Sequence, residues 1–85
     1  MTPTPADTVD RRVLWIVSRL TTVPLDQIGV DDRLRADLGL DSVASMELLG
    51  MLAEEFDIEV PMEETMEVER VEQIIALTRR HLAHA

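Results

Sequence analysis

Three stretches of this 85-residue chain repeat their apolar residues at the spacing of an α-helix, and this periodicity constrains the fold most strongly. The stripes comprise Val9, Val13, Ile16, Val17 and Leu20, then Leu48, Leu49, Leu52 and Phe56, and finally Val71, Ile74, Ile75, Thr78 and Leu82. The chain has no Cys, so the apolar residues must form the core without a disulfide framework or a thiolate zinc site. The pattern predicts an all-α protein built around three longer helices.

The first helix is expected to start near Asp7, with Asp7 or Thr8 as its N-cap, and to end before Pro24. Residues 1–6 contain two prolines and small polar side chains, which offer little apolar surface to bury. We therefore expect a disordered leader over residues 1–6 and one domain over residues 7–85, since a chain of this length forms a single small core.

Residues 21–41 show no sustained periodicity, and a connection of that length in a compact domain requires anchors. The apolar candidates for anchors are Val23, Leu25, Ile28, Val30, Leu34, Leu38 and Leu40, and residues 25–28 are expected to form one helical turn. Gly39 can adopt a positive φ in a tight turn, and Asp41 can cap a second helix that begins at Ser42. Residues 57–61 are expected to form an extended link and residues 63–67 a short helix. The prediction is a four-helix bundle with three longer helices, one short helix and a long ordered loop between the first two.

The second helix has a further apolar stripe on a different face, made of Val43, Met46, Gly50 and Ala53 and flanked by Glu47 and Glu54. A helix with two apolar faces lies deep in a bundle or presents one face to a partner, and the small size of this domain favours presentation. Gly50 costs about 1 kcal/mol relative to alanine inside a helix, which indicates close approach of another backbone or a packing need within the bundle. Trp15 lies opposite the first stripe and is expected to be exposed.

The formal net charge of −9 argues against a nucleic-acid partner and disfavours anionic membranes. From Asp41 to Glu72 there are eleven acidic residues and one basic residue, Arg70, so partners with basic docking surfaces are expected. No apolar run is long enough to span a membrane, and the N-terminus lacks the pattern of a signal peptide. We expect a soluble, cytoplasmic protein.

No catalytic constellation is recognisable, so the chain is not expected to be an enzyme. His81 and His84 fall near the C-terminus, where we expect solvated tail residues. The carboxylates between Glu54 and Glu64 lack the spacing of a calcium loop, and no metal site is expected.

Ser42 is the strongest candidate for a chemical role in this sequence. With Asp41 as the cap, Ser42 lies in the first turn of the second helix, where unpaired backbone N–H groups and the helix dipole would stabilise a phosphate ester. No neighbouring base is evident, so another enzyme would have to activate the hydroxyl. The competing interpretation is that Asp41 and Ser42 are capping residues only.

The run DLGLDSVASMELL over residues 37–49, followed by AEEFDIEVP over residues 53–61 and then MEE, resembles the acyl carrier proteins. The resemblance covers the chain from about Val9 to Leu82. It implies a four-helix, non-catalytic carrier domain whose serine, here Ser42 preceded by Asp41, receives a covalent phosphopantetheine arm from coenzyme A. Such an arm holds acyl groups as thioesters for polyketide or fatty-acid biosynthesis.

The resemblance also implies partners: a phosphopantetheinyl transferase, and acyl-loading and condensing enzymes with basic docking patches. The expected contact residues on the second helix are Val43, Met46, Glu47, Gly50, Ala53 and Glu54. Val43 and Gly50 depart from the larger apolar residues usual in the family, which makes this face smaller and suggests a dedicated set of partners. All eight basic residues are arginine, which favours a high-GC bacterial source, and the protein is expected to be a monomer.

Two alternatives stay open at this point. A stand-alone aminoacyl or peptidyl carrier of a nonribosomal-peptide-type pathway shares the fold and the arm, although its usual Gly-Gly-His-Ser type of motif is absent. An unmodified helical interaction module would use Ser42 as a cap alone.

Overall fold

The structure, a computed structural model, describes residues 5–83 of the chain, with side chains from Val9 onward. This part contains the helices α1 (Pro5–Leu20), α2 (Ser42–Phe56), α3 (Met62–Met66) and α4 (Val71–Ala83), and a 3₁₀ turn, η1 (Leu25–Gln27). Within the described residues, β-type pairing is limited to an isolated bridge between Arg33 and Arg70. The prediction of an all-α bundle with three longer helices and one short helix is confirmed.

Helix α1 begins at Pro5, two residues earlier than expected, so neither Asp7 nor Thr8 is its N-cap. Proline suits the first turn of a helix because its fixed φ is helical and its missing N–H would have no intrahelical partner there. The leader expected at residues 1–6 therefore overlaps α1 at Pro5 and Ala6, and residues 1–4 lie outside the described residues. The helix ends at Leu20, before Pro24, as expected.

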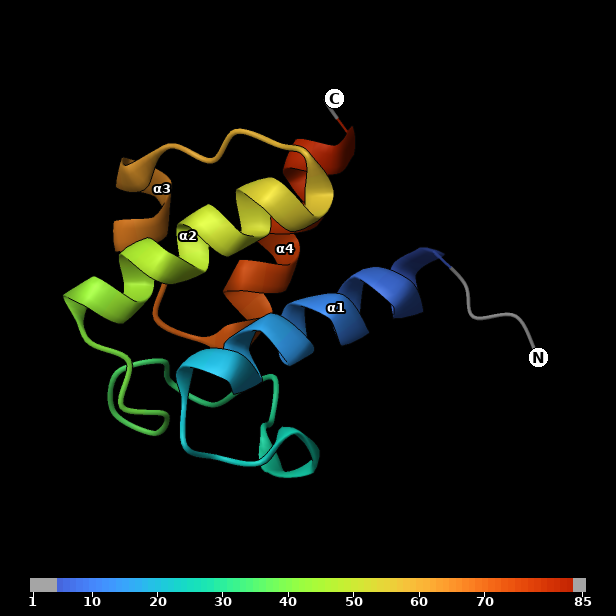
Figure 1. The fold of residues 1–85 in the computed structure, drawn as a ribbon. Helices are drawn as coiled ribbons and strands as arrows, with labels where there is room; N and C mark the ends of the chain where they lie inside the picture. Colours follow the sequence, from blue (N-terminus) through green and yellow to red (C-terminus); the bar gives the residue numbers. More distant parts are fainter. Residues whose placement is uncertain (1–4, 84–85) are drawn as a thin grey trace.

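The core lies where α1 packs against α2 and α4. Figure 1 shows α1 and α2 running side by side in opposite directions, with α4 crossing behind them and the short α3 near the N-terminal half of α2. Most of the three predicted stripes are buried, while Val9, Leu20, Leu49 and Leu82 pack against the core with partial exposure. Each fully buried aliphatic side chain contributes about 1.5–3 kcal/mol, so these stripes hold the bundle together.

Arg12 of α1 fastens the C-terminal end of α2. Its Nη2 donates to the backbone carbonyl of Glu55 at 2.7 Å, its Nε donates to the Glu55 carboxylate at 3.0 Å, and its guanidinium lies 4.4 Å from the centre of the Phe56 ring. Trp15 is 48% exposed, as predicted, and contacts the guanidinium of Arg19 at 5.3 Å. Helix α2 ends in a left-handed residue, Asp57, which closes the helix before the extended link.

The long loop between α1 and α2 is ordered, and four of its seven predicted anchors, Ile28, Leu34, Leu38 and Leu40, are buried. Val23 is half-buried, whereas Leu25 and Val30 are exposed, so the anchoring role predicted for these two is wrong. Leu25 begins the exposed turn η1. The position of Val30 is fixed by its backbone instead, because its carbonyl accepts the N–H of Glu72 at 2.7 Å.

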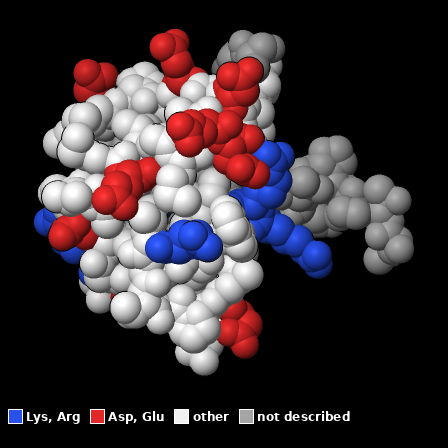
Figure 2. Space-filling view, in the orientation of Figure 1, with Lys and Arg blue, Asp and Glu red and all other residues white. Residues whose placement is uncertain are grey.

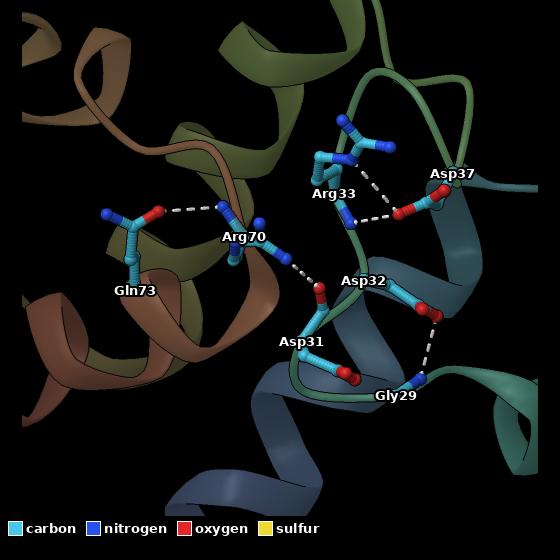
Figure 3. Close-up of polar contacts among 7 residues, drawn as sticks. All are labelled: Gly29, Asp31, Asp32, Arg33, Asp37, Arg70 and Gln73. Atoms are coloured by element: carbon cyan, nitrogen blue, oxygen red, sulfur yellow. Dashed lines mark hydrogen bonds and ion pairs between the residues drawn. The ribbon is translucent and has the colours of Figure 1, made fainter.

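Polar contacts tie this loop to the start of α4, as Figure 3 shows. The Arg70 guanidinium donates to the carbonyl of Asp31 at 2.8 Å, and the Arg70 N–H donates to the side chain of Gln73 at 2.8 Å. Backbone pairs add to this tie: Leu34 N–H with the Glu69 carbonyl at 2.8 Å, and Val71 N–H with the Asp32 carbonyl at 3.0 Å. These contacts fix the segment that leads into α2 against the residues at the start of α4.

Helix α3 is connected to α4 through Glu64, whose carboxylate accepts hydrogen bonds from Arg80 and from the His81 ring, each at 2.6 Å. The prediction of a solvated tail is wrong for His81, because α4 continues to Ala83 and places the ring against α3. His84 lies outside the described residues. The extended link is confirmed over residues 58–61, whereas Asp57 is left-handed and closes α2. The short third helix is confirmed, with bounds Met62–Met66 in place of 63–67.

Candidate attachment site at the start of helix α2

A tight turn delivers the chain from the loop to the first residue of α2. Gly39 has φ 71°, as predicted, a conformation that favours glycine because it has no Cβ. The buried side chains of Leu38 and Leu40 fix the turn on either side of it. The Leu40 N–H donates to the carbonyl of Leu34 at 2.9 Å, which closes the loop just before Asp41.

Asp41 is the N-cap of α2, as predicted. Its backbone is extended, and its Oδ1 accepts the N–H of Ala44 at 2.9 Å. This contact satisfies one of the backbone donors that the first turn of a helix leaves without an intrahelical carbonyl. Ser42 is then the first residue of the helix, and the predicted bounds of α2, Ser42–Phe56, are confirmed.

The Ser42 side chain is exposed, and its Oγ lies 3.3 Å from Nη2 of Arg35, which comes from the loop. No histidine or carboxylate binds this hydroxyl among the described residues, so that part of the chain offers no base to activate it. The site can present a hydroxyl to another protein, and it has a positive charge and a helix N-terminus beside it to stabilise an anion.

A cavity of about 570 Å³ opens beside Ser42, between the loop, α2 and α3. Its walls are largely apolar, with contributions from Leu34, Leu40, Met46, Leu48, Leu49, Met62, Met66 and Val68. The polar side chains on its walls are those of Arg33, Arg35, Ser42, Ser45, Thr65 and Glu69. An extended group attached to Ser42 would thus meet both an apolar wall and the arginines of the loop.

The six residues expected to contact partners lie along α2 on the side away from the core. Val43 is 64% and Met46 58% exposed, Glu47, Gly50 and Glu54 are also exposed, and Ala53 is half-buried. Figure 2 shows acidic side chains spread over the face that carries α2, with basic side chains beside α1 and, fewer in view, at the left edge of the molecule. Around Gly50 the space is open, with no atom of another residue near the position of a Cβ. A packing need within the described bundle therefore does not explain this glycine.

Two features of the site were not predicted from the sequence. Arg35 lies in an aperiodic loop, seven residues before Ser42, and only the fold of that loop brings the two side chains together. The cavity depends on the distance between α3 and α2, and the spacing of apolar residues along one helix does not specify that distance. Its two methionines on α3, Met62 and Met66, gave no periodic signal because the helix has five residues.

Among the side chains described, over residues 9–83, no group of three His, Cys, Asp or Glu residues is arranged to hold a metal ion. None of the helices in this part of the chain is both long enough and apolar enough to cross a membrane.

The fold and site define a small helical domain that presents one hydroxyl, at the start of a capped helix and next to an apolar cavity. Residues 11–78 match the family described as phosphopantetheine attachment site, whose members carry this cofactor covalently. The acyl carrier protein of Rickettsia bellii strain RML369-C is 27% identical over 75 residues, which cover 88% of this chain and 87% of the relative. The acyl carrier protein of Streptomyces coelicolor is 36% identical over 70 residues, which cover 82% of this chain and 72% of the relative.

The chain belongs to the acyl carrier protein family. This result confirms the resemblance drawn from residues 37–61. The family match leaves three points as predictions: which residue bears the arm, which residues contact partners, and which pathway uses the carrier.

Proposed function

We propose that this protein is an acyl carrier that bears phosphopantetheine on Ser42. The observation that carries the proposal is the exposed Ser42 hydroxyl as the first residue of α2, capped by Asp41 and bordered by Arg35 and the cavity. Once bound, the arm supplies a terminal thiol that holds an acyl group as a thioester. The residues present fit such a group, since a phosphodiester on Ser42 would meet a cation and a helix N-terminus.

Attachment requires a partner enzyme. The Ser42 oxygen forms a bond to the phosphorus that carries pantetheine, the pyrophosphate bond of coenzyme A breaks, and adenosine bisphosphate leaves. The serine proton passes to a base of the transferase, because the described part of this chain has no base within reach of the hydroxyl. The carrier contributes the exposed oxygen and the geometry of the turn that presents it.

The acidic, partly apolar face of α2 is the surface that we assign to partner enzymes. Val43, Met46 and Gly50 give a small apolar strip, and Glu47 and Glu54 border it with negative charge. A partner with basic side chains around a shallow apolar groove would complement this face. We assign the carrier, as a monomer, to the cytoplasm of a bacterium, with fatty-acid or polyketide biosynthesis as its pathway.

Intact-protein mass after incubation with coenzyme A and a broad-specificity phosphopantetheinyl transferase tests this proposal. Wild-type protein should gain one phosphopantetheine, and Ser42→Ala should gain none. Ser45→Ala is the matched control, because Ser45 lies one turn further along α2 and also borders the cavity, and it should gain the group normally. If folded wild-type protein gains no phosphopantetheine, the proposal fails and Ser42 has only the role of a residue in the first turn of α2.

The pathway needs a second assay, because an aminoacyl carrier would accept the same arm. Loaded carrier can be offered an acyltransferase with a short acyl-coenzyme A in one reaction and adenylating enzymes with amino acids in another. We expect a thioester from the acyl donor alone. A thioester formed only with an amino acid would replace the acyl carrier proposal by the aminoacyl one.

A further inference from the structure

Arg35 differs from several of the other arginines, which pair with carboxylates. Arg12, Arg33 and Arg80 each pair with a carboxylate, of Glu55, Asp37 and Glu64 respectively. Arg35 pairs with no carboxylate among the described residues, and its one hydrogen bond there goes from Nη2 to the Ser42 hydroxyl. At 3.3 Å this is a long contact to a neutral acceptor, and the other donors of the exposed guanidinium face solvent.

A phosphodiester on Ser42 would supply the acceptor that Arg35 lacks. The phosphorus atom would be bonded to the same Oγ that Nη2 already borders, so its charged oxygens would lie one bond further out, in the space next to the guanidinium. Guanidinium groups bind phosphate oxygens through short, charge-assisted hydrogen bonds, often with two donors at once. The neutral contact seen between Arg35 and Ser42 thus has the geometry from which an ion pair can form by a small side-chain rotation.

A cation next to a phosphodiester on Ser42 would reduce the electrostatic repulsion from the negative charges nearby. A phosphodiester on Ser42 would stand next to the Asp41 carboxylate, in a chain whose formal net charge is already −9. The N-terminus of α2 offsets part of this repulsion, and Arg35 is the cation that contacts Ser42 in the described structure. Arg35 also borders the cavity, so an ion pair with it would hold the first atoms of the arm at the cavity's edge.

We infer that Arg35 is a phosphate-binding residue, which pairs with the phosphodiester of the arm on Ser42 and positions the start of the arm beside the cavity. This inference rests on the proposed attachment at Ser42. Arg35 acts as a positioning residue and takes no part in the transfer of the arm.

The test compares the melting temperature of each protein with and without the arm. In wild-type protein, the difference between the loaded and the unloaded form includes the Arg35 ion pair, and Arg35→Gln removes it. We expect the loaded-minus-unloaded difference in melting temperature to fall by about 1–8 °C in Arg35→Gln, the range for one exposed ion pair in a domain of this size. Because salt screens exposed charges, the change should shrink between low salt and high salt.

Arg33→Gln is the matched control, since Arg33 lies on the same loop and borders the same cavity but pairs with Asp37 instead of Ser42. Arg33→Gln should lower the melting temperatures of the loaded and unloaded forms equally, so that the difference between them stays as in wild type. Arg35→Lys keeps the charge and should restore part of the difference. If Arg35 had only a structural role, Arg35→Gln would change the melting temperatures of the loaded and unloaded forms by the same amount.

A second readout does not depend on the variants. In wild-type protein, the NMR resonance of the Arg35 Nε–H should move when the arm is attached, and that of Arg33 should stay in place. Equal loaded-minus-unloaded differences in wild type and Arg35→Gln, or an unmoved Arg35 resonance in loaded protein, would overturn the inference and leave attachment at Ser42 intact. Failure of wild-type protein to gain the arm would overturn the proposed function and this inference together.

Discussion

Asp41 and Ser42 are neighbours with separate tasks, because Asp41 turns its carboxylate back to the Ala44 N–H while Ser42 stays exposed. Replacement of Asp41 by alanine leaves that N–H without its partner and should cost about 1 kcal/mol. In a domain of this size the melting temperature should fall by about 4–8 °C. Thermal unfolding followed by circular dichroism measures the change.

Asp26 provides the comparison for this variant. It is an exposed aspartate in η1 with no side-chain hydrogen bond to another described residue. Asp26→Ala should leave the melting temperature almost unchanged. Equal effects of the two substitutions would show that the cap contributes nothing measurable to α2.

The carboxylate of Asp37, in the loop before Ser42, should make the stability of the fold sensitive to acid. The backbone N–H of Arg33 donates to its carboxylate at 2.7 Å and, with the nearby Arg33 charge, lowers the pKa of Asp37 below its usual value. A lowered pKa means that this carboxylate stabilises the fold at neutral pH and that its contribution is lost as the pH falls below about 4, the value in an unfolded chain.

Asp37→Asn should therefore be less stable than wild type at pH 7, and the gap should narrow as the pH falls from about 4.5 to 3. Urea unfolding at a series of pH values measures the gap. Asp26→Asn, which lacks such a hydrogen bond, should track wild type throughout. A gap that stays constant over this range would remove Asp37 as a source of acid sensitivity.

At the scale of elements, α2 combines a buried side with an outward side that has open space at Gly50. The open space around Gly50 predicts that Gly50→Ala stabilises the free protein by about 0.5–1 kcal/mol, since alanine lowers the entropy lost on helix formation and meets no neighbour. If a partner's backbone approaches this glycine, the same methyl group should slow acyl transfer by that partner.

Two measurements on Gly50→Ala separate these effects: thermal stability of the free carrier, and kcat/KM of a cognate acyltransferase with the carrier as substrate. Ala53→Ser is a comparison variant of similar size further along the face. A more stable carrier with unchanged kinetics would mean that no partner comes close to Gly50.

The charge on α2 gives a prediction about docking. Reversal of Glu47 and Glu54 to lysine should lower kcat/KM of a cognate enzyme and flatten its dependence on salt, because both exposed carboxylates would attract the basic partner that we propose. A control with the same net charge reverses Glu59 and Glu67, which are exposed but lie off α2. Docking along α2 is contradicted if both double variants slow the enzyme equally.

The sequence was most informative where periodicity and capping coincide. An aspartate cap followed by an apolar stripe located α2 to the residue, because both signals are local. The start of α1 was misplaced because Pro5 was assigned to a leader, although proline is compatible with a first helical turn. Two of the loop anchors were misassigned, because Leu25 begins the exposed turn η1 and Val30 is fixed by a backbone hydrogen bond to Glu72 of α4.

At the scale of the whole molecule, the site is assembled by contacts that join distant segments. The loop before Ser42 is held by Glu69 and Arg70, the residues just before α4. The cavity beside Ser42 is closed on one side by α3, which Glu64 fastens to α4. Spacing along one helix carries no information on these contacts. The exposed serine at the capped start of α2 could therefore be predicted from the sequence, but the cavity and the arginine beside it could not.

The account depends most on Ser42 as the residue that bears the arm. Wild-type protein loaded from coenzyme A can be digested and fragmented in a mass spectrometer to find the modified residue. We predict phosphopantetheine on the peptide that contains Ser42, with fragment ions that place it on Ser42 and leave Ser45 unmodified. Modification at Ser45 or at another hydroxyl, with Ser42 unmodified, would contradict the account of this site.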